Sequence, residues 1–211
     1  MLYLYALVES TAALPVDVEL VSVRGIGAVV GEIDDIRDST DEHVLSHARI
    51  VDRLAALNDA VLPVRFGRGF RAPDELEAAL GRLAPRLEER LRAVRGCVEL
   101  GVHVVGEAPP ASGTEAGADY MRRRLCEVAE AEALADEIHV PLAERSREST
   151  RNGGVAPAAL LRAAYLVPRD GVEAFCGAVE SARQRHPELT FACTGPWPPY
   201  SFADVEDAHE Q

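Results

Sequence analysis

The sequence contains no lysine, so all 22 basic residues of the 211-residue chain are arginines. Schiff-base enzymes need a lysine amine, and nucleotide-binding P-loops need a lysine beside the phosphates, so both classes are excluded. The arginines are outnumbered by 35 acidic residues, which gives a formal net charge of −13 at pH 7. This charge opposes binding to nucleic-acid phosphates and to anionic lipid surfaces. We therefore expect neither nucleic acid nor membrane as a partner.

Long apolar runs are absent as well. No stretch approaches the roughly 20 residues that span a bilayer, and the first residues lack the basic start and small-residue cleavage site of a secretory signal. We therefore expect a cytoplasmic protein. Its length lies between one large and two small domains, and a chain of this size buries roughly 70% of its unfolded surface.

Cysteine pairs and catalytic signatures are missing too. The four cysteines, Cys97, Cys126, Cys176 and Cys193, are far apart and form no CxxC motif. Since each lies among apolar neighbours, we expect buried free thiols in preference to zinc ligands. The sequence has no nucleophile elbow, Walker loop or spaced Ser/His/Asp set. We predict a protein that is not an enzyme and has no catalytic, cofactor-binding or metal-binding residues.

Two weaker motifs invite a ligand. His43 and His47 are four residues apart, so both imidazoles can share one helix face as in metal sites, but a glutamate between them and a third ligand are lacking. Glycines at 25, 27 and 31 follow a predicted strand as in a dinucleotide loop. The β-branched residues after Gly27 favour another strand, so we expect a tight β-turn.

Periodicity predicts an α+β protein of two units. In the first (residues 1–94) we expect strands at 2–8, 16–23, 28–33 and 61–64, and helices at 41–57 and 73–94, the second one kinked or interrupted at Pro85. In the second (residues 95–211) we expect strands at 97–105, 160–167 and 189–194, the last buried, and helices at 118–138 and 171–186. A loop at 107–117 and a second helical piece from Pro141 to about Glu148 complete this unit. Alternating strands and helices suggest a ferredoxin-like type.

Residues 195–202, GPWPPYSF, form an aromatic strap that places the only tryptophan among three prolines. Proline has no N–H and a fixed φ, so the strap cannot pair as a central strand and should leave the sheet extended. Trp197, Tyr200 and Phe202 each have a large apolar body. The strap therefore covers the fold or offers a partner-binding surface; a polyproline ligand is a third interpretation.

A second candidate for partner binding is the glycine-spaced loop of residues 65–71, RFGRGFR. Its guanidinium groups can bind carboxylates in bidentate fashion. Arg65, Phe66 and Arg68 can therefore hold an acidic group of a partner. The alternative is pairing with the chain's own surplus of Asp and Glu.

Four motifs in order resemble the GvpL/GvpF family of gas vesicle proteins. The chain begins MLYLYALV and ends in the strap; between them, VLPVRFG at 61–67 is similar to the family's LPxRFG stretch, and AAYLVPR at 163–169 to its YLV strand. The resemblance implies two small ferredoxin-like domains and a minor structural or accessory component that contacts the major hydrophobic shell protein, and other accessory proteins, during gas vesicle formation. The expected location is then the gas vesicle and the cytoplasm. The alternative is a small-molecule sensor or enzyme that uses a cleft between the two domains.

Overall fold

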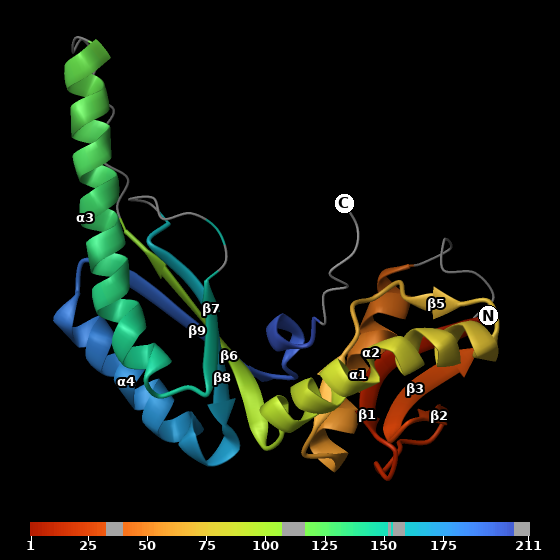
Figure 1. Cartoon of the computed structure of the whole chain (residues 1–211). Helices are drawn as coiled ribbons and strands as arrows, with labels where there is room; N and C mark the ends of the chain where they lie inside the picture. The colour runs from red at the N-terminus through yellow and green to blue at the C-terminus, as the bar shows by residue number, and fades with distance from the viewer. Residues whose placement is uncertain (33–39, 107–116, 152, 154–158, 205–211) are drawn as a thin grey trace. The chain divides into compact units, whose positions relative to one another are not determined.

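Most of the strap, from Trp197 onward, groups with the first unit instead of the second. The computed structural model describes residues 1–32, 40–106, 117–151, 153 and 159–204 (Figure 1). It divides into one unit of Met1–Val98 together with the segment that begins at Trp197, and a second unit of Glu99–Pro196. We had expected a boundary after Val94 and the whole strap in the second unit. The chain instead returns to the first unit at Trp197.

The sheet of the first unit is antiparallel. Its strands are β1 (Leu2–Glu9), β2 (Glu19–Val23), β3 (Ile26–Glu32), β4 (Val61–Pro63) and β5 (Gly69–Phe70). They are arranged β2-β3-β1-β4, and β5 also pairs with β1. Arg24 and Gly25, with φ of 50° and 85°, turn β2 directly into β3, which confirms the predicted β-turn. Because three strands precede the first helix, the element order of this unit is not that of a ferredoxin-like domain.

Two helices of the first unit begin and end where the sequence predicts. They are α1 (Asp41–Leu57) and α2 (Pro73–Val94), and both contact the sheet. Thr40 is the N-cap of α1, and its N–H donates to His43 Nδ1 over 3.3 Å. Pro85 lies inside α2, so the helix continues through it and the expected interruption is wrong.

The second unit alternates strands and helices. Its elements are β6 (Cys97–Val105), α3 (Gly117–Ala143), β7 (Glu148–Arg151), β8 (Leu161–Pro168), a short 3-10 turn (Arg169–Gly171), α4 (Val172–Arg185) and β9 (Thr190–Trp197). The strand order is β7-β8-β6-β9, and β7 and β8 are antiparallel. Helices α3 and α4 contact each other and lie against one face of this sheet (Figure 1).

The structure corrects the expectations for two segments of this unit, the end of α3 and the last strand. Helix α3 continues through Pro141, and the predicted helical piece up to Glu148 is instead a turn that leads into β7. The loop expected at 107–117 lies almost wholly outside the described residues. The last strand extends to Trp197, and of its residues only Phe191 is buried. Proline can occupy β9 because it is an edge strand, where an N–H is not needed for pairing on the open side.

The core of the second unit explains how α3 is held. Ala131, Ala135, Ile138 and Leu142 recur at helical spacing and are buried in the cluster that includes Tyr165. The Tyr165 hydroxyl lies 2.7 Å from His139 Nδ1 on the same helix. Burial raises the pKa of Tyr165, so it stays a neutral phenol. Only the C-terminal half of α3 contributes to this core.

The cysteines differ in their exposure to solvent. Of the four free cysteines only Cys97 is buried, so the expectation of burial is wrong for Cys126, Cys176 and Cys193.

Within the described ranges, no helix combines the length and the apolar character that crossing a membrane requires.

Candidate functional site

The structure brings the arginine loop and the strap together in the first unit. Arg65 lies two residues after the end of β4, and its Nη2 donates to Asp204 Oδ2 over 2.6 Å. Both side chains are well exposed, so solvent screens this ion pair and its contribution to stability is small. The pairing follows the internal alternative that the sequence left open, because the acid comes from this chain.

The strap is anchored by its C-terminal end. Tyr200–Phe202 forms a 3-10 turn that contacts β4. The Nε and Nη2 groups of Arg90 on α2 donate to the carbonyl oxygen of Phe202 over 3.1 and 2.7 Å. The Phe202 side chain is 3% exposed, whereas Trp197 is 52% exposed. The strap therefore covers the core through Phe202, whereas about half of the Trp197 side chain is in water.

A buried histidine on α1 is hydrogen-bonded to the residues that position the arginine loop. His47 on α1 is 4% exposed, and its two ring nitrogens lie 2.9 Å from Tyr3 Oη and from the carbonyl oxygen of Val64. Because that carbonyl can only accept, Nε2–H donates to it and Nδ1 accepts from the Tyr3 hydroxyl. The Gly67 N–H in turn donates to Tyr3 Oη over 3.2 Å. One neutral imidazole thus connects α1, β1 and the loop.

Burial sets the protonation states of this network. It lowers the pKa of His47, although the hydrogen bond to Val64 opposes the shift. It also raises the pKa of Tyr3 and of Tyr5. The pKa of Tyr200 is raised to about 12, chiefly by burial and further by the negative charge of Asp52. At neutral pH the network is therefore uncharged and its hydroxyls remain hydrogen-bond donors.

The aromatic rings around His47 hold the loop in place. The Phe66 ring lies 5.8 Å from the Tyr3 ring and 5.8 Å from the His47 ring, measured between centroids. Tilted and edge-to-face ring contacts of this kind add to the stabilisation from burial. Phe66 therefore works as an anchor of the loop.

The six expected partner-binding residues thus fall into two groups. Arg65, Phe66, Tyr200 and Phe202 are engaged within the unit. Arg68 and Trp197 point outward: both are exposed, and the Arg68 guanidinium makes no hydrogen bond or ion pair with the part of the chain that the structure describes. Arg68 and the exposed half of the Trp197 side chain are therefore accessible to another molecule.

The sequence did not reveal a third surface, on the N-terminal half of α3. Tyr120, Met121 and Leu125 are 45%, 60% and 68% exposed, and no residue from 119 to 130 is buried. Figure 1 shows this half of the helix extending beyond the sheet of its own unit. The sequence pattern places Met121 and Leu125 on the stripe that continues into the core. The run Arg122–Arg124 was the available signal that this part of the helix is surrounded by water.

The charges on this exposed α3 surface are paired within the helix. Arg123 and Arg124 lie 2.6 and 3.2 Å from the carboxylate of Glu127, and Arg122 lies 3.5 Å from Asp119. The Arg123 guanidinium also stacks 5.5 Å from the centre of the Tyr120 ring. Pairs at these spacings support an isolated helix. The apolar side chains are therefore presented on a stable helix whose charges balance locally.

The two histidines considered for a metal are used for other purposes. His43 caps α1, and His47 lies in the buried network. Within the described ranges, no three His, Cys, Asp or Glu side chains are grouped so that they could hold a metal ion. The i,i+4 spacing of the histidines therefore reflects capping and packing.

Comparison with solved structures defines the class of fold. The crystal structure of gas vesicle protein GvpF from an Anabaena species matches with a TM-score of 0.79 and 18% identity, over 100% of this chain and 98% of that chain. GvpF from Microcystis aeruginosa matches with a TM-score of 0.76 and 16% identity, over 97% and 99%. These matches show a mixed α/β fold that shares the architecture of the GvpF structures.

Comparison of sequences defines the family. The family model of the gas vesicle synthesis protein GvpL/GvpF matches residues 1–204. Gas vesicle protein F1 of Halobacterium salinarum is 29% identical over 222 residues, covering 100% of this chain and 96% of that protein. Gas vesicle protein L of a Streptomyces species is 31% identical over 191 residues, covering 78% and 71%. The chain belongs to the GvpL/GvpF family of gas vesicle proteins, and the resemblance seen in its four motifs is confirmed.

Proposed function

We propose that this chain acts in gas vesicle formation as a minor structural or accessory component that contacts the major hydrophobic shell protein. The observation that carries the proposal is the exposed α3 surface, where Met121 and Leu125 lie one helical turn apart and Tyr120 is exposed in the same turn as Met121. Apolar side chains grouped in this way mark protein-interaction sites. A shell protein that is hydrophobic offers the matching chemistry before it polymerises.

The charge of the chain supports the same role. A net charge of −13 keeps a complex with a hydrophobic partner in solution. The arginines on α3 are paired with acids of the same helix, which lowers the cost of taking them out of water at an apolar surface. Binding at this helix would shield the apolar face of the shell protein until assembly.

We further propose that the exposed members of the first unit, Arg68 and Trp197, contribute a second contact to the shell protein or to another accessory protein. An exposed indole and an exposed guanidinium are the side chains most often found at the energetic centre of interfaces. Arg65, Phe66, Tyr200 and Phe202 position this contact from within.

Three further assignments belong to this proposal. The protein works without enzymatic activity, in the cytoplasm and on the gas vesicle. The second unit is of ferredoxin-like type, which its strand-helix-strand-strand-helix-strand order and its strand order β7-β8-β6-β9 support. The two units are functional domains, with the strap serving the first.

A pair of variants on α3 tests the proposed contact. In a gas-vesicle-forming cell that lacks the gene for this chain, Met121→Gln with Leu125→Gln removes the apolar surface while glutamine retains high helix propensity. We expect few or no gas vesicles by electron microscopy. We also expect the free energy of unfolding of the purified variant to differ from that of the wild type by less than about 0.5 kcal/mol, because both positions are exposed.

The matched control places the same new residue elsewhere on α3. Ala129→Gln with Ala133→Gln alters two exposed positions of that helix and should leave vesicle formation intact. Normal vesicles in cells with the Met121 and Leu125 variant, or an equal loss with the control pair, would contradict the assignment of this surface.

A further inference from the structure

Two exposed cysteines of the second unit come from different elements. Cys176 lies on α4 and Cys193 on β9, and both are free thiols. The sequence suggested buried and isolated cysteines, so neither thiol had a role. The contacts that join α4 to β9 determine how the two thiols lie relative to each other.

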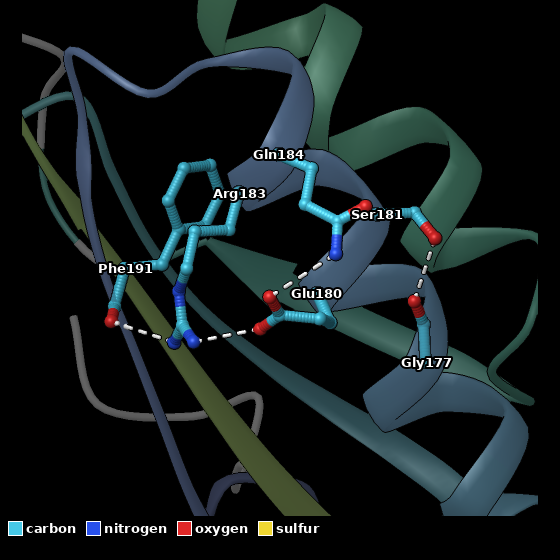
Figure 2. Close-up of polar contacts among 6 residues, drawn as sticks. All are labelled: Gly177, Glu180, Ser181, Arg183, Gln184 and Phe191. Atoms are coloured by element: carbon cyan, nitrogen blue, oxygen red, sulfur yellow. Dashed lines mark hydrogen bonds and ion pairs between the residues drawn. The ribbon is translucent and has the colours of Figure 1, made fainter.

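Arg183 fixes how α4 lies along β9. Its Nη2 donates to the carbonyl oxygen of Phe191 over 3.2 Å, and its Nη1 donates to Glu180 Oε2 over 2.7 Å (Figure 2). The chain reverses direction between the two elements, where the Leu189 N–H donates to the carbonyl oxygen of His186. Helix α4 and strand β9 therefore run antiparallel, so residues before Arg183 on the helix lie beside residues after Phe191 on the strand.

This register brings the two thiols to one place. Cys176 precedes Arg183 by two helical turns, so it faces the same side of α4 about 10 Å along the axis. Cys193 follows Phe191 by two residues, so it lies on the same face of β9 about 7 Å along the strand. The Cys176 thiol is accordingly a near neighbour of the Cys193 thiol, close enough to contribute to the raised pKa of Cys193.

Two neighbouring thiols can be oxidised to a disulfide. Among the described residues no third His, Cys, Asp or Glu joins them to complete a metal site. In a reducing cytoplasm, disulfides are transient and serve as sensors. We propose that Cys176 and Cys193 form a reversible disulfide with a low-molecular-weight disulfide as the oxidant, which locks α4 to edge strand β9.

The reaction proceeds in two exchanges that balance. The Cys176 thiolate attacks one sulfur of the external disulfide, which forms a mixed disulfide and releases the first small thiolate. Cys193 then loses its proton and attacks the Cys176 sulfur, which releases the second small thiolate and forms the internal disulfide. The protein gives up two electrons and two protons, and the external disulfide becomes two thiols.

The environment of Cys193 supports this order of attack. Although Cys193 as a residue is exposed, partial desolvation of its sulfur, and then the neighbouring Cys176, raise the pKa of the Cys193 thiol to about 11. Cys193 is therefore protonated at neutral pH and is a poor first nucleophile. In the second step it lies beside the mixed disulfide, where proximity compensates for its low thiolate fraction.

The test uses the full chain and oxidised glutathione. After incubation, free thiols are alkylated and the peptides are analysed by mass spectrometry. We expect one peptide pair joined through Cys176 and Cys193, lighter by two hydrogens, with buried Cys97 unmodified. Dithiothreitol should restore both thiols, and the linked protein should melt at a higher temperature because the cross-link restricts the unfolded chain.

Single substitutions provide the controls. Cys176→Ser and Cys193→Ser should each abolish the linked pair and the thermal shift, while Cys126→Ser, which changes another exposed cysteine, should abolish neither. Cys176 and Cys193 recovered only as free thiols or as separate glutathione adducts in the wild type would overturn the proposal. So would a link from either one to Cys126.

Discussion

At the scale of single residues, His47 shows how one buried polar side chain fixes a surface loop. Its imidazole joins Tyr3 of β1 to the carbonyl of Val64, and Tyr3 in turn binds the N–H of Gly67. The sequence indicated only that two histidines share a helix face. Which buried acceptor each histidine meets depends on residues far along the chain, so the network could not be predicted.

The network makes stability depend on pH. Burial lowers the pKa of His47 in the folded chain, whereas in the unfolded chain the pKa is about 6.5. Between these two values the unfolded state binds a proton and the folded state does not. The stabilisation is therefore complete above about pH 6.5 and is lost as the pH falls through the folded pKa.

We predict that His47→Gln lowers the free energy of unfolding by about 1–3 kcal/mol at pH 8, because buried partners lose hydrogen bonds. The difference from wild type should shrink as the pH falls from 8 to 5, measured by denaturant unfolding at each pH. His103→Gln, at an exposed position of β6, is the control and should leave the profile of the wild type unchanged. A His47 difference that is constant with pH would exclude a neutral buried imidazole.

At the scale of elements, the helices were predicted better than the strands. Helices α1 and α2 have apolar residues at helical spacing and acidic first turns, and α2 also has proline at its start, all of which are local signals. Strand β7 was missed because its residues ESTR are polar, and its pairing with β8 comes from tertiary structure. The expected break at Pro141 was wrong because a proline can be tolerated near the end of a packed helix.

The candidate site was predicted in part. The sequence singled out the arginine loop and the strap, because clustered arginines and a proline-flanked tryptophan are unusual patterns, and that these segments bind a partner stays a prediction. It could not indicate that Arg65 pairs with Asp204, or that Phe202 is buried while Trp197 is exposed. A chain of alternating prolines and aromatics does not reveal which ring turns inward, since that depends on the surface beneath it.

The strap yields a prediction of unequal effects on stability from two of its rings, one buried and one exposed. Phe202→Ala should destabilise the protein by about 3–5 kcal/mol, because truncation of a buried aromatic leaves a cavity. Trp197→Ala should cost no more than about 1 kcal/mol, because half of the indole is in water. Thermal or urea unfolding of both variants measures the contrast. Equal costs, or a larger cost at Trp197, would mean that the indole covers the core after all.

At the scale of the whole molecule, two separately packed units carry different parts of the proposed function. The first holds the arginine loop and the anchored strap, and the second holds the exposed α3 surface and the thiol pair. The family model spans residues 1–204, so both units belong to what the family shares. The net charge of −13 opposes self-association through the exposed apolar side chains.

Binding to the major gas vesicle shell protein is the central claim, and affinity purification of the tagged, full-length chain from gas-vesicle-forming cells tests it most directly. We predict that the shell protein is recovered with the wild-type chain and with the Ala129 and Ala133 control variant. It should be reduced or lost with the Met121 and Leu125 variant. Absence of the shell protein from the wild-type sample, together with normal vesicles in cells that lack this chain, would contradict the account.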